Sequence, residues 1–325
     1  MDQYNVLILS AGKRVELIEL FQEAAQELGI QSNIIAGDCS EYAPGIYFAD
    51  KKYILPKIKE PSYIDEIIKI CKQENVKLVV PTIDTDLMLL SEERKRIFDE
   101  SGATVLISDL GVVSICRDKI KTQDFFEKNG FLVPKLHDIN KVKIESLKFP
   151  LFIKPKSGSS SISAFKVNSA KELKLFLNIV PNPMLQDYMT GEEYTVDVFL
   201  DFNSNVITIV PRLRMEVRSG EISKGKIVKD YEIIENIKNL MSKFKLIGHI
   251  TIQLMKTKKG IEFIEINPRF GGGAPMSIRS GANSCKNLYS LLMKKHLSYN
   301  EDYEDGLIFL RYDKSICIKD GAIYK

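Results

Sequence analysis

The sequence predicts a mixed α/β and α+β protein in three parts: an N-terminal doubly wound parallel sheet, a small α+β lid, and a C-terminal α+β domain on an antiparallel sheet. Three observations support this. Short apolar runs alternate with longer amphipathic periods up to about residue 109, a strand–turn–strand pattern occupies residues 148–167, and two alternating strands occupy residues 249–270. We place the domain boundaries at residues 1–112, 113–190 and 191–325.

The composition is that of an ordinary globular protein. The 325 residues are 44% apolar and 27% charged, and the length favours two or three domains. No segment is apolar for long enough to span a bilayer, and the amino terminus lacks the features of a signal peptide, so we expect a cytoplasmic protein without a membrane partner. A net charge of +3 gives no basic stripe for nucleic acid. The odd number of scattered cysteines indicates reduced thiols: Cys39, Cys71, Cys116, Cys285 and Cys317.

The N-terminal part reads as parallel βαβ units. Continuous apolar runs followed by amphipathic helices are typical of a sheet covered on both faces. Ligands of such sheets bind beyond the carboxyl ends of the strands, here the loops at residues 10–14, 37–40 and 81–86. A dinucleotide-binding alternative has Asp38 in its favour, but SAGKR is not GxGxxG. The expected strands are 5–10, 32–38, 77–82 and 103–109, and the expected helices are 15–29, 63–75 and 91–102.

The middle of the chain contains two lysines that suit phosphate binding. A helix over residues 117–130 carries Lys119, and the strand PLFIKP carries Lys154 directly before a Gly/Ser-rich loop. A strand lysine beside a flexible loop can clamp phosphates, although the P-loop pattern is absent. Either lysine alone is more commonly a solvated surface charge. A helix over 169–179 and an extended segment over 185–189 follow, and the extended backbone could contact an adenine edge.

The strongest motif is the hairpin HITIQLMKTKKGIEFIEINPRF. A three-residue loop, Lys258 to Gly260, predicts pairing of Thr257 with Ile261. This register places Met255 opposite Phe263, Gln253 opposite Glu265 and Thr251 opposite Asn267 on one face, and Ile252, Leu254, Ile264 and Ile266 on the other. One carboxylate and two amides could hold a hard divalent cation that arrives with a nucleotide. The alternative is a solvated strand face, which Arg269 and the glycines 271–273 disfavour because they suit an anion.

Two further stretches carry charged residues on strands. Glu193 begins the alternating strand EYTVDVFLD, where its carboxylate could accept hydrogen bonds from a ribose, or could simply be an exposed edge acid. The second stretch, PRLRMEVRSGE, is either a grip for phosphate or carboxylate or a basic surface strand. Its alternation predicts one face that contains Arg212, Arg214, Glu216 and Arg218.

Taken in order, these motifs resemble the ATP-grasp superfamily, closest to the branch like the carbamoyl-phosphate synthase large subunits. The resemblance implies an ATP-grasp fold with a pre-ATP-grasp domain, a lid and a C-terminal domain that holds the metal. It implies metal ligands at Gln253, Glu265 and Asn267, and catalytic roles for Arg269, Arg214 and Lys154. The implied nucleotide-binding residues are Lys119, Lys154, Ser159, Gln186, Asp187, Tyr188, Met189, Glu193 and Arg214. Two departures are Asp187, where many relatives have glutamate, and Gln253, where other branches have a carboxylate.

The resemblance implies an ADP-forming ligase that uses ATP with Mg²⁺ or Mn²⁺. A small-molecule carboxylate would be activated as an acylphosphate and then attacked by an amine or another nucleophile. Alternatives are a small-molecule kinase, a carbamoyl-phosphate-type phosphorylation and a non-catalytic ATP-binding module, with an oxidoreductase last. The oligomeric state stays open, a homodimer included. We expect acceptor contacts from Ser10, Thr82, Asp84, Arg214, Gly272 and Arg279.

Overall fold

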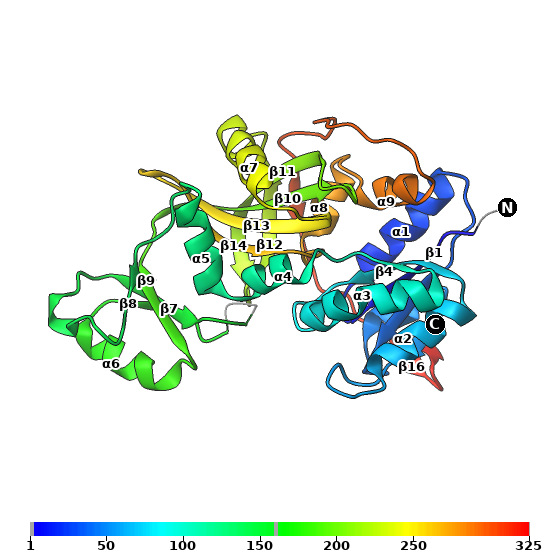
Figure 1. Cartoon of the computed structure of the whole chain (residues 1–325), viewed down its shortest axis with the longest axis horizontal. Coiled ribbons are helices and arrows are strands. Elements are labelled where there is room, and N and C mark those ends of the chain that lie inside the picture. The colour runs from blue at the N-terminus through cyan, green and yellow to red at the C-terminus, as the bar shows by residue number, and fades with distance from the viewer. Residues whose placement is uncertain (1–2, 159–161, 325) are drawn as a thin grey trace.

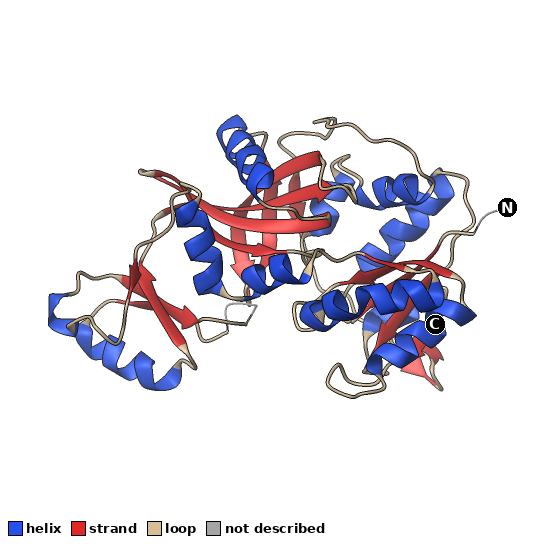
Figure 2. Ribbon diagram, in the orientation of Figure 1, coloured by secondary structure: helices blue, strands red, loops and turns tan. Residues whose placement is uncertain are grey.

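A computed structural model describes residues 3–158 and 162–324 and shows three larger sheets and one two-stranded hairpin in an elongated molecule (Figures 1 and 2). The N-terminal sheet lies at one end, a small lid at the other, and a six-stranded sheet between them. This arrangement confirms the predicted fold class. Among the described residues, no helix combines the length and the apolar character needed to cross a bilayer.

The N-terminal sheet is parallel in the order β3-β2-β1-β4-β5. Residues of β1 alternate between two cores: Val6 and Ile8 face α1, whereas Leu7 and Leu9 face α2 and α3. This double burial explains the unbroken apolar run of β1. The strands are β1 (Asn5–Leu9), β2 (Ile34–Asp38), β3 (Lys51–Ile54), β4 (Val76–Pro81) and β5 (Thr104–Val105); the helices are α1 (Val15–Glu27), α2 (Tyr63–Gln73), α3 (Leu87–Ser101) and the 3₁₀ turn η1 (Pro44–Tyr47).

Two short helices lead from this domain towards the lid. Asp118 separates them and caps the second, because its carboxylate accepts hydrogen bonds from the backbone N–H groups of Ile120 and Lys121. Both helices pack on β14 (Gly260–Asn267) of the six-stranded sheet, and Phe126 contributes to the core between the helices and the sheet. They are α4 (Leu110–Arg117) and α5 (Lys119–Lys128).

The lid is an antiparallel sheet in the order β6-β9-β7-β8 with one covering helix. Its own core is small and centres on Leu151, Ile153 and Leu185. The elements are β6 (Leu136–His137), η2 (Ile144–Ser146), β7 (Leu151–Pro155), β8 (Phe165–Val167), α6 (Ala170–Ile179) and β9 (Pro183–Asp187).

The six-stranded sheet is antiparallel in the order β14-β13-β10-β11-β12-β15. Helix α7 buries Ile233, Ile237 and Leu240 against one face. Helices α8 and α9 pack beside α1 and so connect this sheet with the N-terminal domain. The elements are β10 (Gly191–Leu200), β11 (Val206–Arg218), β12 (Glu221–Ile227), α7 (Tyr231–Lys243), β13 (Gly248–Thr257), β14 (Gly260–Asn267), α8 (Ala274–Arg279), α9 (Ser284–Leu292) and β15 (Ile308–Leu310).

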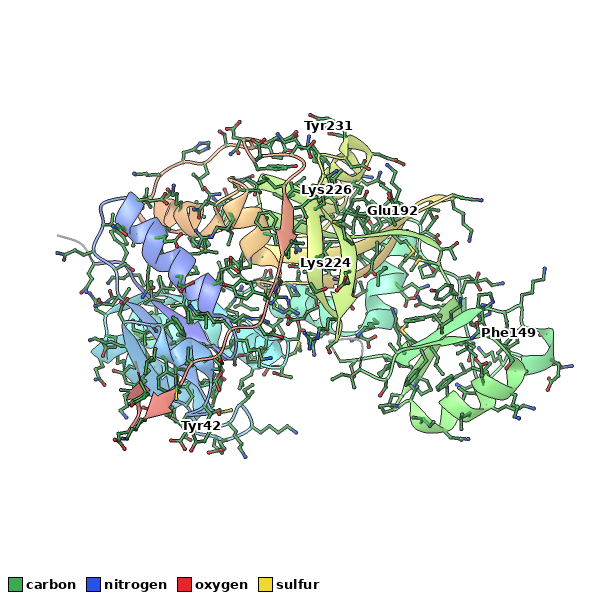
Figure 3. All side chains as sticks on the ribbon, turned by 180° about the vertical axis from the view of Figure 1, so that it is seen from behind. Tyr42, Phe149, Glu192, Lys224, Lys226 and Tyr231 are labelled. Atoms are coloured by element: carbon green, nitrogen blue, oxygen red, sulfur yellow. The ribbon has the colours of Figure 1, made fainter. Side chains whose placement is uncertain are left out.

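The last described residues return to the N-terminal domain. From behind, the chain leaves β15, beside Lys224 and Lys226 of β12, and runs down to the parallel sheet (Figure 3). There β16 (Ile318–Lys319) and β17 (Ala322–Ile323) form a two-stranded hairpin. The Lys52 ammonium donates to the Gly321 carbonyl at 2.6 Å, which ties this hairpin to β3.

Candidate active site

A cavity of about 570 Å³ lies where the three parts meet. Its walls come from the carboxyl ends of the parallel strands, from lid strands β7 and β9, and from one face of the six-stranded sheet. Ser159 lies outside the described residues. The cavity brings together all the other residues predicted to bind nucleotide, to bind the metal or to act in catalysis: Lys119, Lys154, Gln186, Asp187, Tyr188, Met189, Glu193, Arg214, Gln253, Glu265, Asn267 and Arg269.

The β13–β14 hairpin differs from its predicted register near the turn. Its loop has two residues, so Thr257 pairs with Gly260 instead of Ile261. Leu254 pairs with Phe263 and Gln253 pairs with Glu265, which leaves Ile264 as the extra residue of a β-bulge. The bulge restores the predicted pairs Gln253–Glu265 and Thr251–Asn267.

The bulge also exchanges two side chains between the faces of the hairpin. Phe263, expected on the polar face, is buried in the core, with its ring 5.0 Å from that of Phe126 and 5.2 Å from that of Phe131. Ile264, expected in the core, lines the cavity. The two-residue turn places Phe263 on the core face, and burial of its aromatic ring favours this register. Without the bulge, the same turn would direct Glu265 away from the cavity.

The predicted metal ligands contact one another. With its amide oriented to suit its neighbours, Gln253 donates to Glu265 Oε1 at 2.7 Å and accepts from Arg214 Nη1 at 3.1 Å. Asn267 Nδ2 donates to the same Glu265 oxygen at 3.0 Å. Rotation of either amide would present its oxygen, so the set offers one carboxylate and two neutral oxygens. That donor chemistry fits a hard divalent cation whose remaining ligands are phosphate oxygens and water.

Two lysines lie beside this set. Lys119 Nζ donates to the Gly158 carbonyl at 2.7 Å and lies 4.0 Å from Glu265 Oε2. Lys154, on β7, is almost completely buried. Burial lowers the pKa of Lys154 to about 8; Glu265 opposes the shift and Lys119 adds to it. In the part of the chain that the structure describes, no acid lies within salt-bridge distance of Lys154, so this buried ammonium is suited to bind a polyphosphate.

The lowered pKa of Lys154 predicts that nucleotide affinity depends on pH. Because the pKa of Lys154 is about 8, its ammonium loses its proton progressively as the pH rises from 7 to 9.5, and the affinity for a non-hydrolysable ATP analogue with Mg²⁺ is expected to fall over this range. The limiting slope is about tenfold per pH unit for loss of one bound proton. Isothermal titration calorimetry would measure it. Lys154→Arg stays charged throughout this range and should flatten the profile; an equally steep profile in that variant would assign the dependence to another group.

The lid and β10 supply the groups predicted to contact a nucleoside. Gln186 is buried on β9, and the Tyr188 ring has Phe152 at 6.3 Å and the Lys166 ammonium at 4.4 Å. Asp187 pairs with His137 Nε2 at 2.7 Å. Its carboxylate is therefore engaged within the lid.

Glu193 and Arg214 form an ion pair in the cavity wall, with 3.0 Å between Glu193 Oε1 and Arg214 Nε. Arg214 also donates to Thr195 Oγ1 and to the Gly220 carbonyl, both at 3.1 Å. Burial raises the pKa of Glu193, with Arg214 acting against the shift and Glu265 adding to it. Arg214 thus lies between the predicted ribose acid and the predicted metal ligand Gln253.

Arg269 connects the C-terminal domain with the rim of the parallel sheet. Its Nε and Nη2 donate to the two carboxylate oxygens of Asp84 at 3.0 and 2.8 Å, and its Nη1 donates to the Phe270 carbonyl. Asp84 is almost completely buried, and Arg117 Nη1 lies 3.8 Å from it. The bidentate geometry holds the guanidinium rigidly at the cavity.

Some residues that were expected to contact a ligand lie outside the cavity. The arginine strand is not one continuous face, because β11 is irregular between Arg214 and Val217. Glu216 pairs with Lys224 and Arg218 with Asp313, all on the exposed surface outside the cavity. Two of the expected acceptor contacts also lie outside the cavity. Ser10 donates to Asp86 and Arg279 pairs with Glu23 on α1, and neither lines the cavity.

Sequence reasoning missed a buried ionic cluster behind the cavity. Arg212, which is 1% exposed, donates from Nε and Nη2 to the two oxygens of Asp197 at 2.7 and 3.0 Å. Ser277 Oγ also donates to Asp197, and His249 Nε2 lies 3.5 Å from it. The available signal was the period-two pattern of β10, which puts Asp197 on the same face as Glu193.

Comparison with known families agrees with this geometry. Residues 6–106 match the model described as PylC-like, N-terminal domain, and residues 180–311 match the model described as ATP-grasp in the biosynthetic pathway with Ter operon. The chain carries an ATP-grasp domain. The predicted membership of the ATP-grasp superfamily is thereby confirmed.

Curated relatives of this ATP-grasp protein include three named enzymes. A carbamoyl-phosphate synthase of Methanobrevibacter smithii is 23% identical over 83% of this chain and 76% of its own length. A 3-methyl-D-ornithine–L-lysine ligase of Methanosarcina mazei is 23% identical over 67% of this chain and 58% of its own. A D-alanine–D-alanine ligase of Bacillus anthracis is 29% identical over 41% of this chain and 50% of its own. The chain thus spans about half the length of the two ligases.

Solved structures show the same fold. N5-carboxyaminoimidazole synthetase of Staphylococcus aureus, complexed with ADP, has a TM-score of 0.72 and 16% identity over 94% of this chain and 80% of its own. The biotin carboxylase domain of 2-oxoglutarate carboxylase from Hydrogenobacter thermophilus, in complex with MgADP and bicarbonate, has a TM-score of 0.72 and 17% identity over 95% of this chain and 74% of its own. These likenesses establish the ATP-grasp fold.

Proposed function

We propose that this chain is an ATP-dependent ligase that activates a small-molecule carboxylate as an acylphosphate, releases ADP and transfers the acyl group to an amine. The main support for the proposal is the set of side chains that line one cavity. The cavity is lined by a carboxylate with two amides, by two lysines, by several arginines and by the rim of the parallel sheet. The named ligase relatives support the same assignment.

The proposed nucleotide site uses the lid and the hairpin. Lys119 and Lys154 bind phosphate oxygens, Gln186 to Met189 contact the adenine, and Glu193 accepts from the ribose. Gln253, Glu265 and Asn267 hold Mg²⁺ or Mn²⁺, which when bound neutralises phosphate charge and orients the terminal phosphoryl group. Each of these assignments uses a residue that lines the cavity.

The chemistry has two displacements. A carboxylate oxygen of the substrate attacks the γ-phosphorus of ATP, the bond from that phosphorus to the β–γ bridging oxygen breaks, and ADP leaves. The amine nitrogen then attacks the acyl carbon, phosphate leaves with its oxygen, and the nitrogen loses a proton. The protein positions the reactants and stabilises charge. In this proposal, Arg269 and Arg214, which both line the cavity, stabilise the transferring phosphoryl group, and the pairing of Arg269 with Asp84 supports this role by holding its guanidinium in position.

The proposal is tested by ADP release from ATP with Mg²⁺ or Mn²⁺ and pooled carboxylates, with pooled amines or hydroxylamine as the nucleophile. Hydroxylamine converts an acylphosphate to a hydroxamate, which is detected by its iron complex. We expect ADP and hydroxamate in equal amounts that depend on the carboxylate. ADP release with a stable phosphorylated product, unaffected by hydroxylamine, would instead establish the kinase alternative. ATP binding without turnover under all these conditions would refute the ligase.

A further inference from the structure

The part of the cavity next to the glycine loop Gly271–Gly273 contains two arginines from different domains. Arg14 follows β1 in the N-terminal domain, and Arg212 lies on β11. A Cβ atom placed on Gly272 would lie 2.9 Å from Arg14 Nη1, and one on Gly273 would lie 2.6 Å from Arg212 Nη1. The absence of side chains on this loop is therefore what allows both guanidiniums to approach it.

One nitrogen of the Arg212 guanidinium, Nη1, lacks a strong hydrogen-bond acceptor among the described residues. Asp197 accepts from its Nε and Nη2, but the described partner of Nη1 is Met276 Sδ at 3.8 Å, and sulfur is a weak acceptor. The side chain is 1% exposed and still lines the cavity. A buried N–H group aimed at a cavity without an oxygen acceptor is suited to bind an anionic group of a ligand.

Arg14 is also loosely held. Its described polar contacts are a 3.4 Å hydrogen bond from Nη2 to the Thr82 carbonyl and a 3.8 Å separation between Nη1 and Glu221 Oε1. Burial lowers the pKa of Arg14, with Glu221 acting against the shift. Both distances are longer than those of a good charge-assisted hydrogen bond, so Arg14 gains from a closer anion.

Glu221 adds the opposite charge at the same place. Arg311 Nη1 donates to its Oε2 at 3.0 Å, whereas its Oε1 faces Arg14 and would lie 2.9 Å from a Cβ on Gly272. The glycine loop therefore has two under-coordinated cations and one carboxylate oxygen around it. Such a pattern matches a ligand that carries both a carboxylate and an ammonium group.

We propose that Arg14 and Arg212 bind the carboxylate of the acyl donor beside Gly272 and Gly273, and that Glu221 binds an ammonium group on the same molecule. This inference rests on the proposed ligase function and names its substrate class as zwitterionic amino acids. A simple carboxylate would leave Glu221 without its new partner, and a dicarboxylate would meet repulsion there.

The test compares matched pairs in the hydroxylamine assay with saturating ATP and Mg²⁺. Alanine of either hand is compared with propionate, glutamate of either hand with glutarate, and lysine of either hand with 6-aminohexanoate. We expect kcat/KM to be roughly 10–100-fold higher for at least one amino acid than for its partner without the α-ammonium group. Glu221→Gln should reduce that ratio by about tenfold or more while leaving the KM for ATP unchanged.

Arg14→Gln should raise the KM for the same amino acid roughly 10–100-fold, again without a change in the KM for ATP. The matched control is Glu216→Gln on the neighbouring strand, which is exposed and outside the cavity. Thermal melts establish that the variants fold. If the partners without the α-ammonium group react as well as the amino acids, or if Glu221→Gln keeps the ratio, the amino-acid subsite is wrong and the ligase stands. If no carboxylate at all gives ADP or hydroxamate, the ligase function itself fails.

Discussion

Replacing Glu265 with glutamine is expected to reduce ADP formation by a factor of about 10²–10³, the range found when one charge-stabilising group is lost from an active site. Glu265 is the one carboxylate in the predicted cation set, and both amides of that set donate to it. The substitution preserves size but removes the charge that balances a divalent cation. ADP release measured over a series of Mg²⁺ concentrations should show a weaker and right-shifted response.

Glu192→Gln provides the control for this experiment. Glu192 is an exposed acid on β10 and lies outside the cavity; Figure 3 labels it on the six-stranded sheet. It should leave both the rate and the Mg²⁺ response unchanged. If Glu265→Gln and Glu192→Gln gave the same Mg²⁺ response as the unmodified protein, Glu265 would have no part in cation binding.

Much of the fold was predictable because its elements carry strong local patterns. The apolar run of β1 followed by the amphipathic period of α1 is the pattern that indicates a covered parallel sheet. The edge strand β3 was missed because its residues Lys51–Ile54 are mostly exposed and lack an apolar run. Its backbone pairing with β2 determines it, and a sequence pattern does not report such pairing.

The cavity was predictable where residues lie close together in one strand or hairpin. Period-two alternation was enough to place Gln253, Glu265 and Asn267 on one face, although a bulge that sequence does not reveal was needed to keep them there. Pairs between distant segments were beyond such reasoning. Asp84 and Arg269 are 185 residues apart, and their pairing depends on how two domains are packed.

The same limit applies to the buried ionic cluster around Asp197, whose members come from distant segments. Among the substitutions considered, removal of the Asp197 charge should have the largest effect on the stability of the protein. Asp197→Asn is expected to lower the free energy of unfolding by about 3–5 kcal/mol, because it leaves the Arg212 guanidinium buried without its counter-ion. Since the protein has no tryptophan, urea unfolding followed by circular dichroism is the suitable measurement. The matched control is Asp313→Asn, which breaks an exposed pair with Arg218 and should cost at most about 1 kcal/mol.

The pH dependence of this difference identifies the charge of Asp197 as its cause. Burial alone would raise the pKa of Asp197, but Arg212 and His249 outweigh it and hold the pKa well below its usual value. A depressed pKa gives stability that is fully present above the unfolded pKa of about 3.9 and is lost as the pH falls towards the folded value. The gap between the unmodified protein and Asp197→Asn should therefore be constant from pH 5 to 8 and shrink below about pH 4. A gap that stayed constant below pH 4 would show that side-chain packing, and not the buried charge, determines the stability of this cluster.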